Sequence, residues 1–102
     1  MTSAGDPDPS DANAITRVMK IVNEKGLHAR ASAKFVQTVE KFDARVTVSR
    51  GGESAGGDSI MGLMMLAAGI GTSISVSASG PEAVPCVDAL DALVSSRFGE
   101  DE

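Results

Sequence analysis

The stretch ITRVMKIVNEKGLHARASAKFVQTVEKFDARVTVS, residues 15–49, decides the fold because its hydrophobic period changes twice. Apolar residues alternate over Ile15–Val22, as in a half-buried strand. Over Ala29–Phe42 they recur at helical spacing and form one apolar stripe. Alternation returns over Arg45–Ser49, which predicts a second strand. The helical stripe consists of Ala31, Phe35, Val39 and Phe42.

The segment 50–79 is expected to hold a short helix between two strands. A glycine turn leads into a weak strand near 54–55. Ser59 has the chemistry of an N-cap and precedes a short helix over 60–66. Serine alternates with apolar residues over 72–79, which is typical of a strand with one buried face.

A last helix is expected from about Glu82 to Arg97, with Ser79 and Glu82 forming a capping box at its start. Its apolar stripe is expected to contain Val84, Val87, Leu90 and Val94. The element order is then strand, helix, strand, strand, helix, strand, helix. Because each strand has one polar face, the pattern predicts an α+β fold in which an antiparallel sheet carries its helices on one side.

The composition restricts the class of protein further. A chain of 102 residues has room for one hydrophobic core, and with three Phe and neither Tyr nor Trp that core must be aliphatic and rich in methionine. No apolar run approaches the roughly 18 residues that a membrane span needs. The single cysteine, Cys86, cannot form an internal disulfide, and we expect it to be a buried apolar residue of a cytoplasmic protein.

The acidic residues are concentrated at the two ends of the chain. We expect residues 1–14 to be a disordered acidic leader without the apolar block of a secretory signal, 15–99 to be the domain, and 100–102 to be an acidic tail. Six of the fourteen acidic residues lie in these tails, so the body of the chain contains eight acidic and nine basic residues and is nearly neutral. The body has no basic stripe and few aromatic residues, which argues against nucleic-acid binding.

The only histidine, His28, lies where a loop becomes a helix. The first turn of a helix has unpaired N–H groups and a partial positive charge, so this position suits phosphate chemistry. A ring nitrogen could attack phosphorus, Arg30 could hold the phosphate oxygens, and Gly26 would let the backbone come close. Alternatively, His28 is only an N-cap or a surface residue. One histidine and one cysteine do not make a zinc site, so no metal or cofactor is expected.

Two features around residues 59–66 could also be functional. Ser59 is either a simple cap or a regulatory phosphorylation site at a favourable helix end. If Leu63 and Leu66 face the core, the opposite side of this short helix must be exposed and could bind protein partners, unless loops or the leader cover it. Its exposed residues would be Ile60, Met61 and Met64. A glycine inside this helix, Gly62, suggests close approach by another chain.

Two segments resemble the HPr family, the histidine-containing phosphocarriers of the bacterial phosphotransferase system. Residues 26–31, GLHARA, resemble the active-site segment of that family, and residues 58–66, DSIMGLMML, resemble its regulatory-serine segment. The separation of 31 residues between His28 and Ser59 also agrees with the family. The resemblance covers Ile15 to Phe98. It implies an open-faced sandwich with four antiparallel strands and three helices.

The resemblance also implies roles for individual residues. His28 would accept a phosphoryl group on Nδ1 from phosphorylated enzyme I and pass it to enzyme IIA proteins, with Arg30 steadying the phosphate. Ser59 would be the target of HPr kinase/phosphorylase, and the protein would be a carrier rather than an enzyme. The positions that meet partner proteins in the family are occupied here by Ile60, Met61 and Met64. Family members usually have proline where this chain has Ala31, and some have a basic residue where it has Asp58.

Three alternatives remain open at this point. The carrier could belong to the nitrogen-related branch of the phosphotransferase system. The chain could instead be a small acyl-phosphate hydrolase that uses Arg30 and Asn23 without His28. It could also be a binding module that docks through Met61 and Met64 irrespective of phosphorylation. The small size and shallow site favour a monomer.

Overall fold

The computed structural model describes residues 14–100, which form one sheet and its covering helices. The strands appear in the expected order, with a short 3₁₀ helix, η2, after the last α-helix. The strands and helices, in chain order, are β1 (Ile15–Lys20), α1 (Ala29–Val39), β2 (Arg45–Arg50), β3 (Glu53–Gly56), α2 (Ile60–Met65), β4 (Ser73–Ser79), α3 (Ala83–Ser95) and η2 (Arg97–Gly99).

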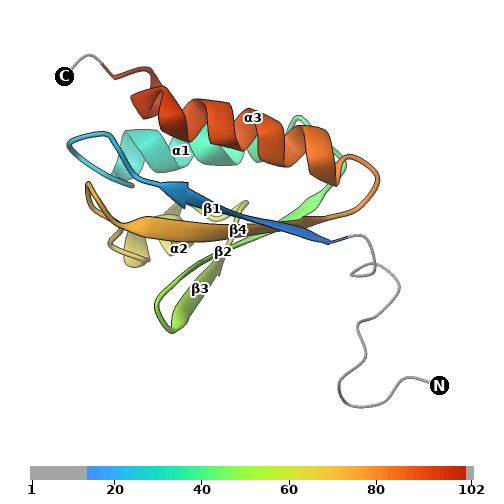
Figure 1. Cartoon of the computed structure of the whole chain (residues 1–102), viewed down its shortest axis with the longest axis horizontal. Helices are drawn as coiled ribbons and strands as arrows, with labels where there is room; N and C mark the ends of the chain where they lie inside the picture. The colour runs from blue at the N-terminus through green and yellow to red at the C-terminus, as the bar shows by residue number, and fades with distance from the viewer. Residues whose placement is uncertain (1–13, 101–102) are drawn as a thin grey trace.

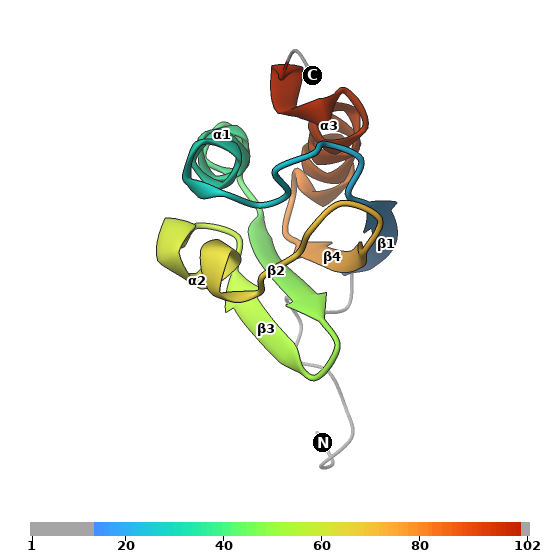
Figure 2. The same ribbon diagram turned by 90° about the vertical axis from the view of Figure 1, so that its left-hand side faces the viewer.

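The four strands form one antiparallel sheet in the order β1-β4-β2-β3. The α-helices all lie on the same face of this sheet, with α3 over β1 and β4, α1 in the middle and α2 beside β3 (Figures 1 and 2). This confirms the expected α+β fold, an open-faced sandwich with the element order βαββαβα. Within residues 14–100, no helix combines the length and the apolar character that crossing a membrane requires.

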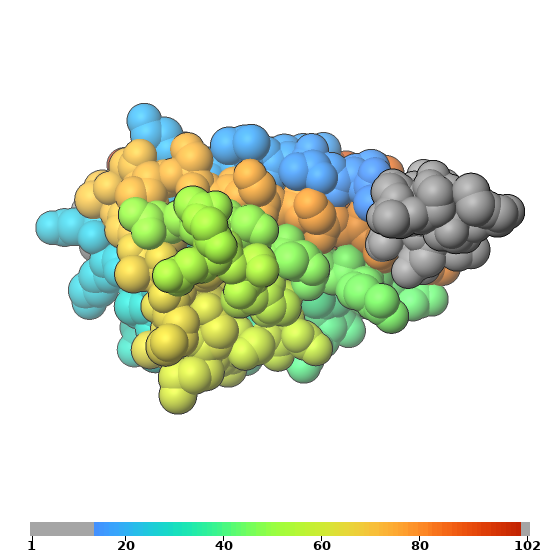
Figure 3. All heavy atoms as spheres, turned by 90° about the horizontal axis from the view of Figure 1, so that it is seen from below, coloured from blue at the N-terminus to red at the C-terminus, as the bar shows by residue number. Residues whose placement is uncertain are grey.

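The pleat of the sheet separates an apolar face from a polar one. Val48 lies opposite Val76 and Met19 lies opposite Ile74, and these four side chains are buried beneath the helices. On the other face Thr16, Ser77 and Thr47 lie side by side across three strands, and the Thr16 and Ser77 hydroxyls are hydrogen-bonded at 2.8 Å. Figure 3 shows this face, which the helices leave uncovered.

The first helix is shorter than the sequence predicts. It ends at Val39 instead of Phe42, because the N–H groups of Lys41 and Phe42 donate to the carbonyls three residues back instead of four, which replaces the α-helical pattern by a tighter turn. Phe42 still packs against the core from the following turn, so its place in the apolar stripe is correct although its helical conformation is not.

The last helix departs further from the prediction. It runs over Ala83–Ser95, and no capping box forms, because Ser79 ends β4 and the Glu82 carboxylate accepts the backbone N–H of Asp43 at 2.7 Å. Val84 is exposed, which corrects its expected place in the stripe. The buried stripe consists of Ala83, Cys86, Val87, Leu90 and Val94.

The single cysteine, Cys86, lies on the inner side of α3. It is fully buried, as expected, and desolvation raises the pKa of its thiol.

The outer side of α3 forms ion pairs with β1. Arg17 of β1 donates hydrogen bonds to Asp88 at 2.9 Å and Asp91 at 3.3 Å, and the Asp88 hydrogen bond raises the pKa of the guanidinium. These contacts join the outer side of α3 to β1.

Candidate functional site

His28 is the N-cap of α1. Its backbone is extended, and its ring nitrogen Nδ1 accepts the backbone N–H of Arg30 at 3.3 Å. Because Nδ1 accepts this bond, its lone pair points at the amino end of the helix, and the ring carries its proton on Nε2. The side chain is 28% exposed, so the ring is reachable from solvent. His28 is thus an N-cap whose ring also remains reachable from solvent.

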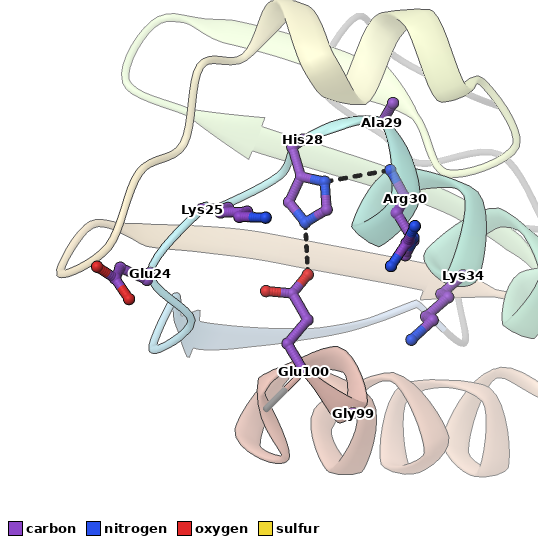
Figure 4. A pocket seen from close by; sticks show the side chains of 8 residues that line it. All are labelled: Glu24, Lys25, His28, Ala29, Arg30, Lys34, Gly99 and Glu100. Carbon is purple, nitrogen blue, oxygen red and sulfur yellow. Dashed lines mark hydrogen bonds and ion pairs between the residues drawn. The ribbon is translucent and has the colours of Figure 1, made fainter. Parts of the chain in front are cut away.

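The other ring nitrogen of His28 contacts a residue from the far end of the chain. Nε2 donates to Oε2 of Glu100 (Figure 4). The second oxygen of this carboxylate, Oε1, accepts from Nδ2 of Asn23 at 3.2 Å. From the sequence, Glu100 is expected in an acidic tail and not in the site. His28 and Glu100 are 72 positions apart, so no local spacing reveals this pair.

The turn that follows α3 carries Glu100 to the ring. Arg97, Phe98 and Gly99 all have left-handed backbones, with φ of 61°, 56° and 73°. Phe98 is fully buried in the core, and its carbonyl accepts Nζ of Lys34 from α1 at 2.6 Å. The buried ring and this hydrogen bond hold the turn against the first helix, and Glu100 is the next residue.

The loop before His28 is held from two sides. Nδ2 of Asn23 donates to the Gly26 carbonyl at 2.9 Å, and the Leu27 N–H donates to the Ala68 carbonyl at 3.0 Å. Gly26 has a φ of 63°, and a Cβ there would lie 2.3 Å from the Ala68 oxygen. Glycine is thus required both by the backbone conformation and by the contact.

We expect Gly26→Ala to destabilise the fold by more than Gly51→Ala. Both glycines have φ near 60°, but a Cβ at Gly51 meets nothing within 4 Å. Gly51→Ala should therefore cost only the left-handed strain, about 1–2 kcal/mol. Gly26→Ala adds a clash with backbone and should exceed that cost by at least about 1 kcal/mol in urea unfolding. Equal costs for the two variants would show that the Ala68 contact relaxes freely.

A pocket opens beside the ring, lined by the side chains of two acidic residues and three basic ones. Figure 4 shows the long side chains of Lys25, Arg30 and Lys34 around the His28 ring. The lining residues are Glu24, Lys25, His28, Ala29, Arg30, Lys34, Gly99 and Glu100. Cationic groups next to a helix amino end are suited to binding a phosphate-sized anion. Within residues 14–100, no cluster of three or more His, Cys, Asp or Glu side chains is arranged to hold a metal ion.

Ser59 lies outside this pocket. It is the N-cap of α2, as expected, and its Oγ accepts the backbone N–H of Gly62 at 2.9 Å. A Cβ at Gly62 would lie 3.0 Å from Ala55 Cβ and from Ser59 Oγ. The close approach suggested by Gly62 therefore comes from β3 and the cap of the same chain.

The outer side of α2 is apolar and exposed, as the sequence predicts. Leu63 and Leu66 are buried, whereas 70% of Met61 is exposed. A hollow lined in part by His28 and by Ala67–Gly69 adjoins the loop after α2. The exposed apolar residues of this region, here called the apolar patch, are Ile60, Met61, Met64, Met65 and Ile70. Met65 and Ile70 are not among the exposed residues that the sequence predicts.

Asn23 and Ala31 are both buried behind the site. The Asn23 amide nitrogen is shared between the loop and Glu100, while its Oδ1 has no hydrogen-bond partner among the described residues. Ala31, at the position where proline is usual, is fully buried in the first turn of α1. The helix starts at Ala29 without that proline.

Comparisons with known proteins agree over nearly the whole described chain. The family model described as "PTS HPr component phosphorylation site" matches residues 15–96. Phosphocarrier protein HPr of Cupriavidus necator is 48% identical over 88 residues, which covers 86% of this chain and 99% of the relative. Phosphocarrier protein NPr of Shewanella violacea is 38% identical over 86 residues, covering 84% and 94%.

The fold is also similar to solved structures of HPr proteins. The crystal structure of HPr-C-His from Thermoanaerobacter tengcongensis superimposes with a TM-score of 0.82 at 36% sequence identity. The match covers 86% of this chain and 99% of the other. The similarity thus includes the sheet, the helices and the loop that carries His28.

Proposed function

Because this chain belongs to the HPr family, the phosphocarriers of the phosphotransferase system, we propose that His28 accepts a phosphoryl group from phosphorylated enzyme I and passes it to enzyme IIA proteins. Family members are carriers, not catalytic enzymes. The observation that carries the proposal is the direction of His28 Nδ1, whose lone pair faces the amino end of α1. We infer that Nδ1 is the phosphorylated atom.

The surroundings of Nδ1 suit both formation and loss of the N–P bond. The lone pair forms the bond to phosphorus while the bond to the donor breaks with its electron pair. The phosphoryl oxygens would take over the N–H of Arg30 from the ring and pair with the Arg30 guanidinium. The site is shallow and part-exposed, so a donor or acceptor protein can align its own phosphorylated group in line.

We further propose that the partner proteins dock on the apolar patch next to His28. Methionine-rich surfaces repack easily against different partners, which suits a carrier that meets several proteins. Residues 67–69, which line the hollow beside the ring, lie in the loop between Met65 and Ile70 of the patch. We still predict that the protein is a monomer and that this docking occurs in the cytoplasm.

The sugar-uptake carrier and the nitrogen-related carrier are both supported by named relatives. Identity is 48% to an HPr and 38% to an NPr, which favours the HPr role for this chain. The two are separated by presenting the phosphorylated protein to purified sugar-specific and nitrogen-related enzyme IIA domains. The faster acceptor identifies the branch.

The test of the carrier function is phosphorylation by phosphoenolpyruvate and purified enzyme I. We expect one acid-labile phosphoryl group per chain, located on Nδ1 of His28 by NMR of the modified ring. A phosphoryl group on Nε2, or on a side chain other than His28, would contradict the proposed geometry.

Ser59 is proposed as the target of HPr kinase/phosphorylase. Its hydroxyl is at the start of α2, within 2.9 Å of a backbone N–H, where an added phosphate is stabilised by the helix end. Incubation with the kinase and ATP should give an acid-stable phosphate that is lost in Ser59→Ala. Asp58→Lys, which restores the basic residue some members have, should raise the rate if Asp58 hinders the kinase. An acid-labile product alone would contradict this role.

A further inference from the structure

The side chains of His28, Glu100 and Asn23 form a chain of hydrogen bonds. The amide nitrogen of Asn23 donates to Oε1 of Glu100, and Oε2 of the same carboxylate accepts from Nε2 of His28. The Glu100 side chain is only 13% exposed. A hydrogen bond to a part-buried carboxylate is stronger than one at the open surface, so this contact can orient the ring.

The backbone that presents Glu100 is strained. Arg97 and Phe98 are consecutive non-glycine residues with left-handed φ, a conformation that is retained only where the surroundings impose it. The buried Phe98 ring and the bond from Lys34 to the Phe98 carbonyl impose it here. The strain is located where the chain turns toward the ring, and it places one carboxylate on Nε2.

We propose that Glu100 is a positioning residue for His28: its carboxylate holds the ring proton on Nε2 and keeps the Nδ1 lone pair directed at the amino end of α1. The inference rests on the proposed phosphoryl transfer and extends it. When Nδ1 bonds to phosphorus, the donor's bond to phosphorus breaks and its electron pair remains on the donor. The ring keeps its Nε2 proton and becomes positively charged, and the Glu100 carboxylate stabilises that charge.

The first test observes the ring without any transfer. In ¹⁵N NMR of the unphosphorylated protein, the protonated and unprotonated ring nitrogens have well-separated shifts. We expect the wild type to hold the Nε2–H tautomer and Glu100→Ala to populate the Nδ1–H tautomer as well. Glu100→Gln keeps an acceptor without the charge and should lie between them. A ring that stays on the Nε2–H tautomer in Glu100→Ala would overturn the proposal.

The second test measures the initial rate of phosphorylation by phosphoenolpyruvate and enzyme I. Glu100→Ala should be slower by about tenfold, the effect that loss of one charge-assisted hydrogen bond can produce, and Glu100→Gln should be slower by less. Glu40→Gln is the matched control, since it removes one exposed acidic charge at the other end of α1. It should behave like the wild type.

Two further outcomes would also overturn the positioning role. Faster transfer in Glu100→Ala would make the carboxylate a shield that repels the phosphoryl group. Equal slowing in Glu40→Gln would assign the effect to net charge. Failure of the wild type to take up label would instead contradict the proposed function, and the tautomer measurement would still test Glu100.

Discussion

His28→Ala should take up no label from phosphoenolpyruvate and enzyme I, at any time or concentration at which the wild type is fully labelled. The chain has no second histidine, so the N–H groups and Arg30 that would bind the phosphoryl oxygens have no ring nitrogen to support. The measurement is incorporation of radioactive phosphate, with Ser59→Ala as the control that should label fully. Full labelling of His28→Ala would end the carrier interpretation.

The variant should still fold, which makes the result interpretable. The Nδ1 cap of α1 is long, at 3.3 Å, and replacing a cap by alanine costs about 1 kcal/mol. A circular dichroism melt checks this directly. The same variant also tests the two rival interpretations. Acyl-phosphate hydrolysis that survives His28→Ala would favour the hydrolase, and partner binding unaffected by either phosphorylation would favour the binding module.

Phe98→Ala should cost about 3–5 kcal/mol of unfolding free energy, although Phe98 is close to the end of the chain. The ring is fully buried, and its removal leaves a cavity and releases the left-handed turn that the ring holds in place. Urea unfolding measures the loss. The same variant should weaken the contact between Glu100 and Nε2, visible as a change of ring tautomer.

Phe98→Leu is the matched control for this loss. It keeps an apolar side chain in the cavity and should cost less than about 1.5 kcal/mol. If Phe98→Ala were no worse than Phe98→Leu, the segment after α3 would contribute little to the fold, and the position of Glu100 would not depend on Phe98.

The strands, the first helix and the place of His28 could be predicted from the sequence because each depends on local patterns. Alternation and helical spacing reflect which side chains face the core, and a polar residue before a helix reflects unpaired N–H groups. Val87, Leu90 and Val94 are buried as predicted, but Val84 is not, because Val84 and Ala83 are both apolar and only the packing against the sheet decides between them.

Glu100 could not be predicted in the same way. Its approach to His28 needs two non-glycine residues in a left-handed conformation, which no propensity favours, and the buried Phe98 to enforce it. The contacts of the Asn23 amide could not be predicted either, because the amide reaches both the loop and the Glu100 carboxylate only in the folded chain. Long-range contacts of this kind depend on the tertiary structure.

The loop between Met65 and Ile70 of the apolar patch lines a hollow together with His28, whereas the uncovered sheet face carries serine and threonine. The donor protein and the acceptor protein would then compete for the same surface and could not bind at the same time. Each relay step would have to finish, and its partner leave, before the next could begin. Kinetically, the protein would behave as a substituted intermediate: double-reciprocal plots should be parallel, and an excess of the unphosphorylated acceptor should slow recharging.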